Sequence, residues 1–347
     1  MGFLKGSTWE PVMTKNTSSS SYWINWRVLV CAIWLIIPLV FSFFLISKYE
    51  GPHKGKNRVH FENNTVPVPE EEDEDEEEDA GILYEDEVWR PCLKGIHPVW
   101  LLAFRVLAFV VILSVLVLNV AVDGGDIFYY YTQWSFALIT IYFGLGSVLS
   151  MYGCYQFLKR VGGNTMSNQV TDAEIGTSTM LSNGAKEAPE NRRQIIAGFW
   201  AYLFQIIFQM NAGAVILTDC VFWLIIVPFL EIKDCNLNFF IINMHTINAI
   251  FLLGDTALNS LRFPWFRISY FVIWTVIYVI FQWIAHVCIP LWWPYPFLDL
   301  SSTFAPLWYF LVALMHIPCY GVFILIMKLK YVLLSKWFPD SYMCMKS

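Results

Sequence analysis

Long apolar stretches recur along this chain, and they restrict its fold more than any other feature of the sequence. Several exceed the roughly 20 residues that a helix needs to cross the hydrocarbon core of a bilayer. A segment in lipid must satisfy its own backbone hydrogen bonds, which a helix does internally. Only 14% of the residues are charged, against about 25% in soluble domains. The sequence therefore predicts an all-α, polytopic transmembrane helix bundle of about seven spans.

The apolar pattern predicts one N-terminal span followed by a membrane core of about six spans. The organisation that we expect is a polar N-terminal tail (1–27), a first span (28–46), an acidic disordered loop (47–97), the core (98–330) with a flexible loop (159–194), and a C-terminal tail (331–347). The spans expected within the core cover residues 98–120, 128–158, 195–230, 238–259, 268–289 and 305–327.

Lys and Arg are unevenly distributed between the two ends of the predicted bundle. By alternation, the acidic loop, the 159–194 loop, the 259–267 loop and the C-terminal tail share one end, which carries most of them. The other end has only Lys5, Lys15, Arg27 and Lys233. Basic loops stay on the cytosolic side, so we expect a cytosolic C-terminus in the plasma membrane or an endomembrane. The acidic run at 70–79 is then a docking element for a cytosolic partner.

The predicted span at 238–259 carries an unusual polar stripe. Asn238, His245, Asn248, Asp255 and Asn259 recur at steps of three, four or seven residues, which places them on one helical face. A charged side chain at membrane depth costs roughly 2.5–3.5 kcal/mol on insertion scales. The stripe is therefore expected to face the interior of the bundle and not the lipid.

His245 and Asp255 are the ionisable members of this stripe, and each has two interpretations. His245 is expected near the midplane, where it is either a hydrogen bond between helices or a functional group. Asp255 is expected to form a structural pair with Arg105 or Arg262. Further polar positions in other spans predict a polar bundle interior: Gln205, Gln209, Tyr278, Gln282, His286, His316 and Tyr320.

Several chemistries lack their sequence signals. The chain has no Gly-rich phosphate loop, no GxSxG elbow, no HExxH motif and no lysine at mid-depth in the last span. Broken helices and internal repeats typical of transporters are not evident either. The eight cysteines are scattered without CxxC or metal-ligand spacing. We therefore expect no disulfide framework, no metal, no cofactor and no nucleic-acid partner.

Four short motifs resemble the androgen-induced transmembrane hydrolase family and its rolling stone relatives. They are TQWSFALITIYFGLG (132–146), NMHTINAIFLLGD (243–255), WIAH (283–286) and YPFLD (295–299). The resemblance implies a threonine hydrolase that cleaves lipid esters, in particular fatty acid esters of hydroxy fatty acids. It also implies that Thr132 is the nucleophile and His245 its base. Asn248 or Asp255 would then orient the imidazole.

Two functions remain open from the sequence. The first is an intramembrane lipid-ester hydrolase that uses Thr132 and His245 on an acyl-chain substrate drawn from the bilayer. The second is a non-enzymatic scaffold or receptor-like protein of the rolling stone type, in which the stripe is structural. The predicted depths of the two residues differ by about 5–10 Å, whereas a nucleophile and its base must come within about 3 Å. The hydrolase therefore requires both residues to line one cavity.

Overall fold

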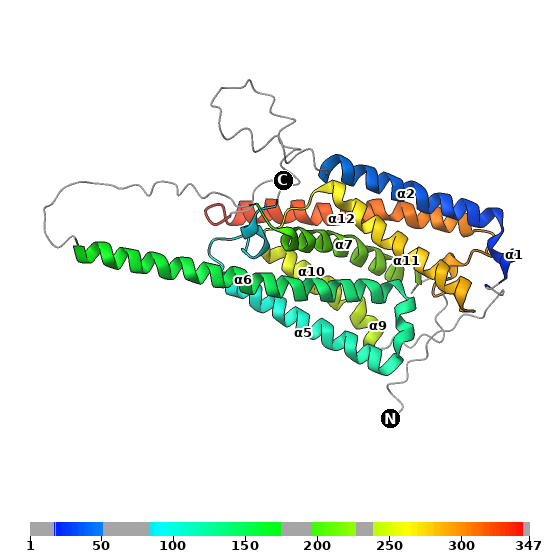
Figure 1. Cartoon of the computed structure of the whole chain (residues 1–347), viewed down its shortest axis with the longest axis horizontal. Helices are drawn as coiled ribbons and strands as arrows, with labels where there is room; N and C mark the ends of the chain where they lie inside the picture. Colours follow the sequence, from blue (N-terminus) through cyan, green and yellow to red (C-terminus); the bar gives the residue numbers. More distant parts are fainter. Residues whose placement is uncertain (1–16, 18, 51–82, 175–195, 227–238, 343–347) are drawn as a thin grey trace, which may run out of the picture.

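The computed structural model describes residues 17, 19–50, 83–174, 196–226 and 239–342, which form a helical bundle (Figure 1). Six of its helices are long and apolar enough to cross a membrane, so the predicted multi-pass helical architecture is confirmed. These helices are α2 (Trp26–Glu50), α5 (Pro98–Asp123), α6 (Tyr131–Glu174), α7 (Phe199–Cys220), α11 (Ile268–Cys288) and α12 (Ala305–Trp337).

The expected span at 238–259 is two helices and not one. α9 (Phe239–Met244) and α10 (Ile247–Leu258) are separated at His245 and Thr246. Asn and Thr side chains compete for backbone hydrogen bonds, which disfavours a continuous helix through this polar run. The predicted polar stripe nevertheless faces inward, since Asn248, Asp255 and Asn259 are all buried. Asn238 lies outside the described residues.

Two other elements differ in extent from the expected spans. α7 changes after Cys220 into a short π-helix, η4 (Val221–Ile226), within the segment expected as one long or kinked helix. α6 continues as a helix as far as Glu174, into the segment expected to be a flexible loop. In Figure 1 this extension of α6 projects beyond the other helices.

One end of the bundle is closed by segments distant in sequence. Isolated backbone bridges join Tyr84 to Ile196, Pro91 to Asn259 and Leu93 to Tyr342. The bridges of Pro91 and Leu93 place the acidic loop, the start of the 259–267 loop and the C-terminal tail at one end, as predicted. Within the expected acidic loop, residues 83–97 contain the 3-10 helix η2 (Glu85–Val88) and pack into this end. The acidic run at 70–79 lies outside the described residues.

Cys92 belongs to this closed end and is disulfide-bonded, whereas Cys31, Cys154, Cys220, Cys288 and Cys319 are free. We expected no disulfide framework, but Cys92 does form a disulfide, because sequence spacing does not reveal which thiols meet in space. Such a bond indicates an oxidising compartment, whereas the Lys and Arg distribution indicates the cytosol. The charge distribution involves many residues, so the cytosolic orientation stays our prediction.

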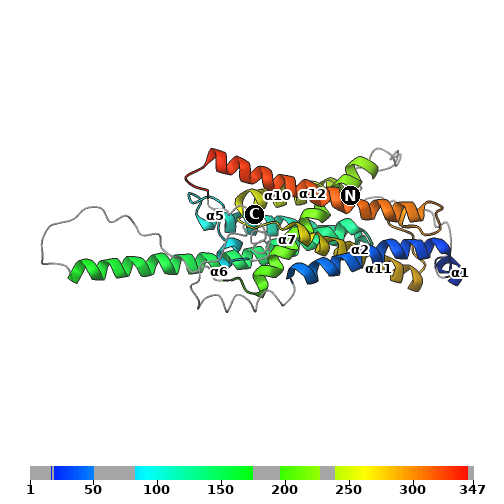
Figure 2. The same ribbon diagram turned by 90° about the horizontal axis from the view of Figure 1, so that it is seen from above.

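α2 packs against α11 and α12, while α5 and α6 pack together on the opposite side of α7. Figure 1 shows α2 alongside α12 and away from α5, and Figure 2 shows it alongside α11. Its outer face is apolar and exposed at Ile33, Ile36, Ile37 and Phe41. The N-terminal span is therefore an integral part of the bundle, with its outer face toward lipid.

Candidate functional site

Thr132 lies at the start of α6, beside the loop that follows α11. Its Oγ1 is 3.4 Å from the hydroxyl of Tyr295. Burial raises the pKa of Tyr295 above its ordinary value, so this hydroxyl stays protonated and can donate a hydrogen bond. The hydroxyl that contacts Thr132 thus belongs to a tyrosine, and the partner is not an imidazole.

His245 lies at the break between α9 and α10 and contacts the end of α7. Its Nδ1 is 3.2 Å from Oδ1 of Asp219, and its ring stacks on Phe222 with centroids 3.9 Å apart. Phe222 belongs to the π-helix η4, a type of distortion that is frequent at functional sites. When Nδ1 carries the proton it donates to Asp219, which leaves Nε2 as an acceptor.

The structure does not join Thr132 to His245 by a hydrogen bond, but the residues next to them are in contact. Nε2 of Gln133 donates to the sulfur of Met244 at 2.6 Å. The start of α6 and the end of α9 are therefore adjacent. Their candidate side chains have separate partners in the described part of the chain.

Asn248 and Asp255 do not orient the imidazole. The side-chain oxygen of Asn248 accepts from the backbone N–H of Ala249 at 2.8 Å. Asp255 pairs with Arg105 at 2.7 Å, and Tyr142 and Asn259 also donate to it. This cluster is the structural pair expected from the sequence. The group that contacts His245 is Asp219, an acidic residue of α7 that lies outside the polar stripe.

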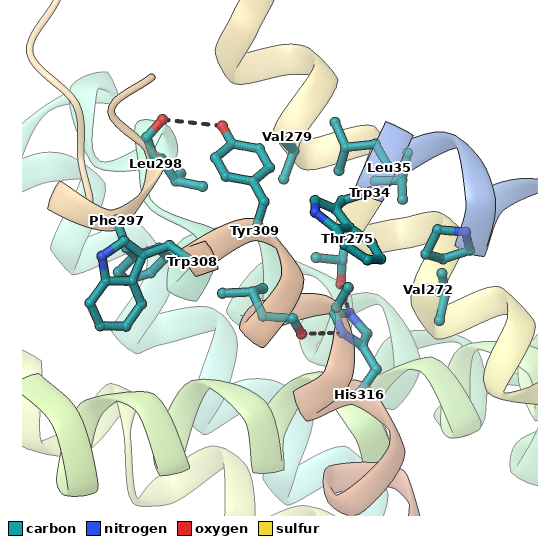
Figure 3. A pocket seen from close by; sticks show the side chains of 14 residues that line it. Trp34, Leu35, Val272, Thr275, Val279, Phe297, Leu298, Trp308, Tyr309 and His316 are labelled. Atoms are coloured by element: carbon teal, nitrogen blue, oxygen red, sulfur yellow. Dashed lines mark hydrogen bonds between the residues drawn. The ribbon is translucent and has the colours of Figure 1, made fainter. Parts of the chain in front are cut away.

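A second hydroxyl and imidazole meet between α11 and α12 (Figure 3). Oγ1 of Thr275 is 2.9 Å from Nε2 of His316, whose Nδ1 is 2.8 Å from the carbonyl oxygen of Val312. A carbonyl only accepts, so in the neutral imidazole Nδ1 carries the proton and Nε2 is free to accept. The geometry therefore favours a hydrogen bond donated by Thr275 to His316.

Tyr131 completes this arrangement. Its hydroxyl is 2.8 Å from Oγ1 of Thr275, a distance at which it can donate while Thr275 donates to His316. The carbonyl of Phe271, at 3.3 Å, is the other acceptor within reach of Thr275. The hydroxyl of Thr275 thus has a base on one side, which is the arrangement that activates a weak nucleophile, and a donor that fixes its orientation on the other.

The Thr275–His316 pair lines an apolar groove between α2, α11 and α12. Figure 3 shows both side chains pointing into this groove together with Trp34, Tyr309 and Val279. Its cavity volume is about 40 Å³, and the empty space is about 460 Å³ when the part open to the surroundings is included. The other lining residues are almost entirely apolar: Leu35, Pro38, Val272, Val276, Phe297, Leu298, Trp308, Val312 and Ala313.

Two aromatic side chains connect Thr132 to the same groove. Tyr295, its hydrogen-bond partner, stacks on Phe297 with ring centroids 5.1 Å apart, and Phe297 lines the groove. Tyr131 precedes Thr132 and bonds to Thr275. The start of α6 therefore connects the threonine named by the resemblance with the threonine that the structure pairs to an imidazole.

Sequence reasoning identified His316 as one of several polar positions but missed Thr275 and Asp219. Both missed residues act through contacts between helices that are distant in sequence, so no local spacing pairs them with a histidine. In the described part of the chain no group of three His, Cys, Asp or Glu residues could hold a metal ion. The chemistry available in this region is that of hydroxyls, imidazoles and one carboxylate.

Comparisons with known protein families, curated proteins and solved structures give no match to this chain.

Proposed function

We propose that this multi-pass membrane protein is an intramembrane hydrolase of lipid carboxylic esters. The observation that carries the proposal is the 2.9 Å contact between Thr275 and His316 beside an apolar groove. A hydroxyl in contact with a neutral imidazole is the minimal arrangement for nucleophilic attack on an ester. An apolar lining with few polar groups suits an acyl chain.

The reaction follows from this geometry. Thr275 attacks the ester carbonyl carbon while its proton passes to Nε2 of His316. The carbon–oxygen bond to the alcohol breaks, and the alcohol leaves with that proton. Water, activated by His316, then hydrolyses the acyl-threonine. Tyr131 donates to Oγ1 of Thr275 and so holds this hydroxyl with its own proton directed at His316.

The family resemblance assigns the same chemistry to a different pair. In that assignment Thr132 is the nucleophile and His245 the base, oriented by Asp219 through the 3.2 Å contact. The Gln133–Met244 contact brings the two segments together, which supports this pair as well. Both assignments share the substrate class, and they differ in which side chains the reaction requires.

The test is ester hydrolysis by purified membranes that contain the full-length chain. The substrates are a fatty acid ester of a hydroxy fatty acid and a hydrophobic fluorogenic ester. The variants are Thr275→Val and His316→Gln for the first pair, and Thr132→Val and His245→Gln for the second. Thr140→Val is the matched control, because Thr140 is buried and its hydroxyl donates to the carbonyl of Phe136 in its own helix.

Loss of turnover by about 10²–10⁴-fold in both members of one pair identifies the catalytic pair. Equal expression and an unchanged elution volume in detergent exclude misfolding. Turnover that depends on Thr132 and His245, and not on the other pair, supports the assignment implied by the resemblance. Wild-type turnover no higher than that of empty membranes would overturn the hydrolase and favour the non-enzymatic scaffold.

A further inference from the structure

Four elements line the groove, and one of them is the N-terminal span. α2 contributes Trp34, Leu35 and Pro38, while the other lining residues come from α11, α12 and the short helix η6 (Pro296–Leu298). In Figure 3 the α2 segment lies across the groove from His316. Without α2, the side of the groove facing Val272 and Val276 would lie open to the lipid.

We propose that α2 completes the substrate site, so that the acyl chain of the ester lies between α2, α11 and α12. The chain enters this groove directly from the bilayer. That the bound ester is a substrate rests on the proposed hydrolase. That an alkyl chain binds here rests on the groove alone.

The chemistry of the lining selects the ligand. Its polar side-chain atoms gather mainly at Thr275 and His316, while the hydroxyl of Tyr309 is occupied by the carbonyl of Leu298 at 3.1 Å. A ligand with one long apolar segment and one polar group matches this distribution. A membrane lipid ester has that composition, with its carbonyl at the hydroxyl–imidazole pair and its chain along α2.

The route from the bilayer follows from the residues at the edge of the groove. Trp308 lines the groove and is 37% exposed, and Leu311 on the same helix is also 37% exposed. On α2 the groove-lining residues Trp34, Leu35 and Pro38 are each partly exposed. The groove is therefore continuous with the apolar outer surface, and an alkyl chain reaches it without leaving an apolar environment.

Pro38 gives α2 a property suited to this role. A proline inside a helix has no N–H to donate, so Pro38 cannot bond the carbonyl of Trp34 one turn earlier. Both residues line the groove. α2 therefore lacks one backbone hydrogen bond where it lines the groove. A helix bends most easily at such a position, which allows α2 to bend aside for an entering chain.

The experiment measures binding separately from hydrolysis. The probe is a non-hydrolysable ether analogue of the fatty ester, with a photoreactive diazirine in its chain. It is irradiated in membranes that contain the full-length protein, and the adducts are mapped by peptide mass spectrometry. Ala313→Phe and Leu35→Phe fill the groove, and Ile37→Phe adds the same ring to the outer face of α2 as a matched control.

We expect adducts on the groove-facing residues of α2 and α12, and about a tenfold loss of labelling in the groove-filling variants, because a ring displaces a few methylene groups from the site. Ile37→Phe should label like the wild type. Equal labelling in Ala313→Phe and Ile37→Phe, or adducts confined to outward-facing residues, would overturn the inference. If a groove-filling variant does not fold, Trp34→Ala is used instead, because it widens the groove. Labelling of this variant by a branched-chain probe that equals labelling of the wild type would count against the site.

Hydrolysis and binding then separate the two proposals. Specific labelling without turnover in any preparation supports the groove and overturns the hydrolase. Turnover that depends on Thr275 and His316 but is insensitive to groove filling supports the hydrolase and overturns the role of α2.

Discussion

Arg105 and Asp255 lie 150 residues apart and form an ion pair of 2.7 Å in which both side chains are fully buried. Arg105 also donates to Ser150 and to the carbonyl of Val88, so most of its donors are satisfied. The pair ties α5 to α10 and to the closed end of the bundle. A buried charge is tolerated only with such partners.

We expect Asp255→Asn to destabilise the protein by about 3–5 kcal/mol, because it leaves the guanidinium of Arg105 buried without its counter-charge. Thermal unfolding in detergent measures the loss. Asp86→Asn is the control, since the Asp86–Arg90 pair is partly exposed, with side-chain exposures of 37% and 24%, and such pairs contribute about 0–1 kcal/mol. Equal shifts in the two variants would contradict the structural role of the buried pair.

Gly213 and Gly321 are both in helices, and we expect opposite effects when each becomes alanine. A Cβ at Gly213 would lie 2.3 Å from the ring of Phe271, whereas nothing lies within 4 Å of one at Gly321. Gly213→Ala should therefore cost about 1–3 kcal/mol through overpacking between α7 and α11. Gly321→Ala should be neutral or stabilising by up to about 1 kcal/mol. Melting temperatures of the two variants in one detergent decide this.

Glu87 gives the closed end a pH dependence. Burial raises its pKa to about 7, outweighing the opposing effect of Arg262, which lies 2.9 Å away. The folded state therefore holds the proton more tightly than the unfolded chain. The stability from Glu87 is complete below its ordinary pKa of 4.5 and is lost as the pH rises through about 7.

Thermal unfolding at about pH 5 and about pH 8 tests this dependence on both sides of the transition. The stability of the wild type should fall over this interval relative to Glu87→Gln, which stays neutral. Glu85→Gln removes one charge from the same short helix and serves as the control. Parallel pH profiles of wild type and Glu87→Gln would show that Glu87 does not titrate in this range.

A variant of Tyr131 distinguishes a catalytic role of Thr275 from a purely structural one. In the proposed reaction its hydroxyl holds Oγ1 of Thr275 in position toward His316, so Tyr131→Phe should lower kcat by about tenfold, the effect of one neutral hydrogen bond. KM should change little, because the groove is unaltered. Tyr152→Phe, at an exposed position of the same helix, is the control. An unchanged kcat would remove Tyr131 from the mechanism.

Much of the architecture was predictable because it depends on local composition. Apolar length identified each of the six long helices, and helical spacing placed Asn248, Asp255 and Asn259 on a buried face. The Arg105–Asp255 pair was one of two candidates, because each buried acid needs a cation. The break at His245 was not predicted, since polar residues in an apolar run are equally compatible with a continuous helix.

The sequence by itself determined that this chain is a multi-pass helical membrane protein. The reason is that each span must satisfy its own backbone hydrogen bonds and keep charges away from lipid, and both requirements can be read from the local sequence. Only the tertiary structure decided which polar groups meet. It paired His245 with Asp219 and Thr275 with His316, and it placed α2 along the groove. Helices pack through side chains distant in sequence, so partnership between them is a property of the assembled bundle and not of any one span.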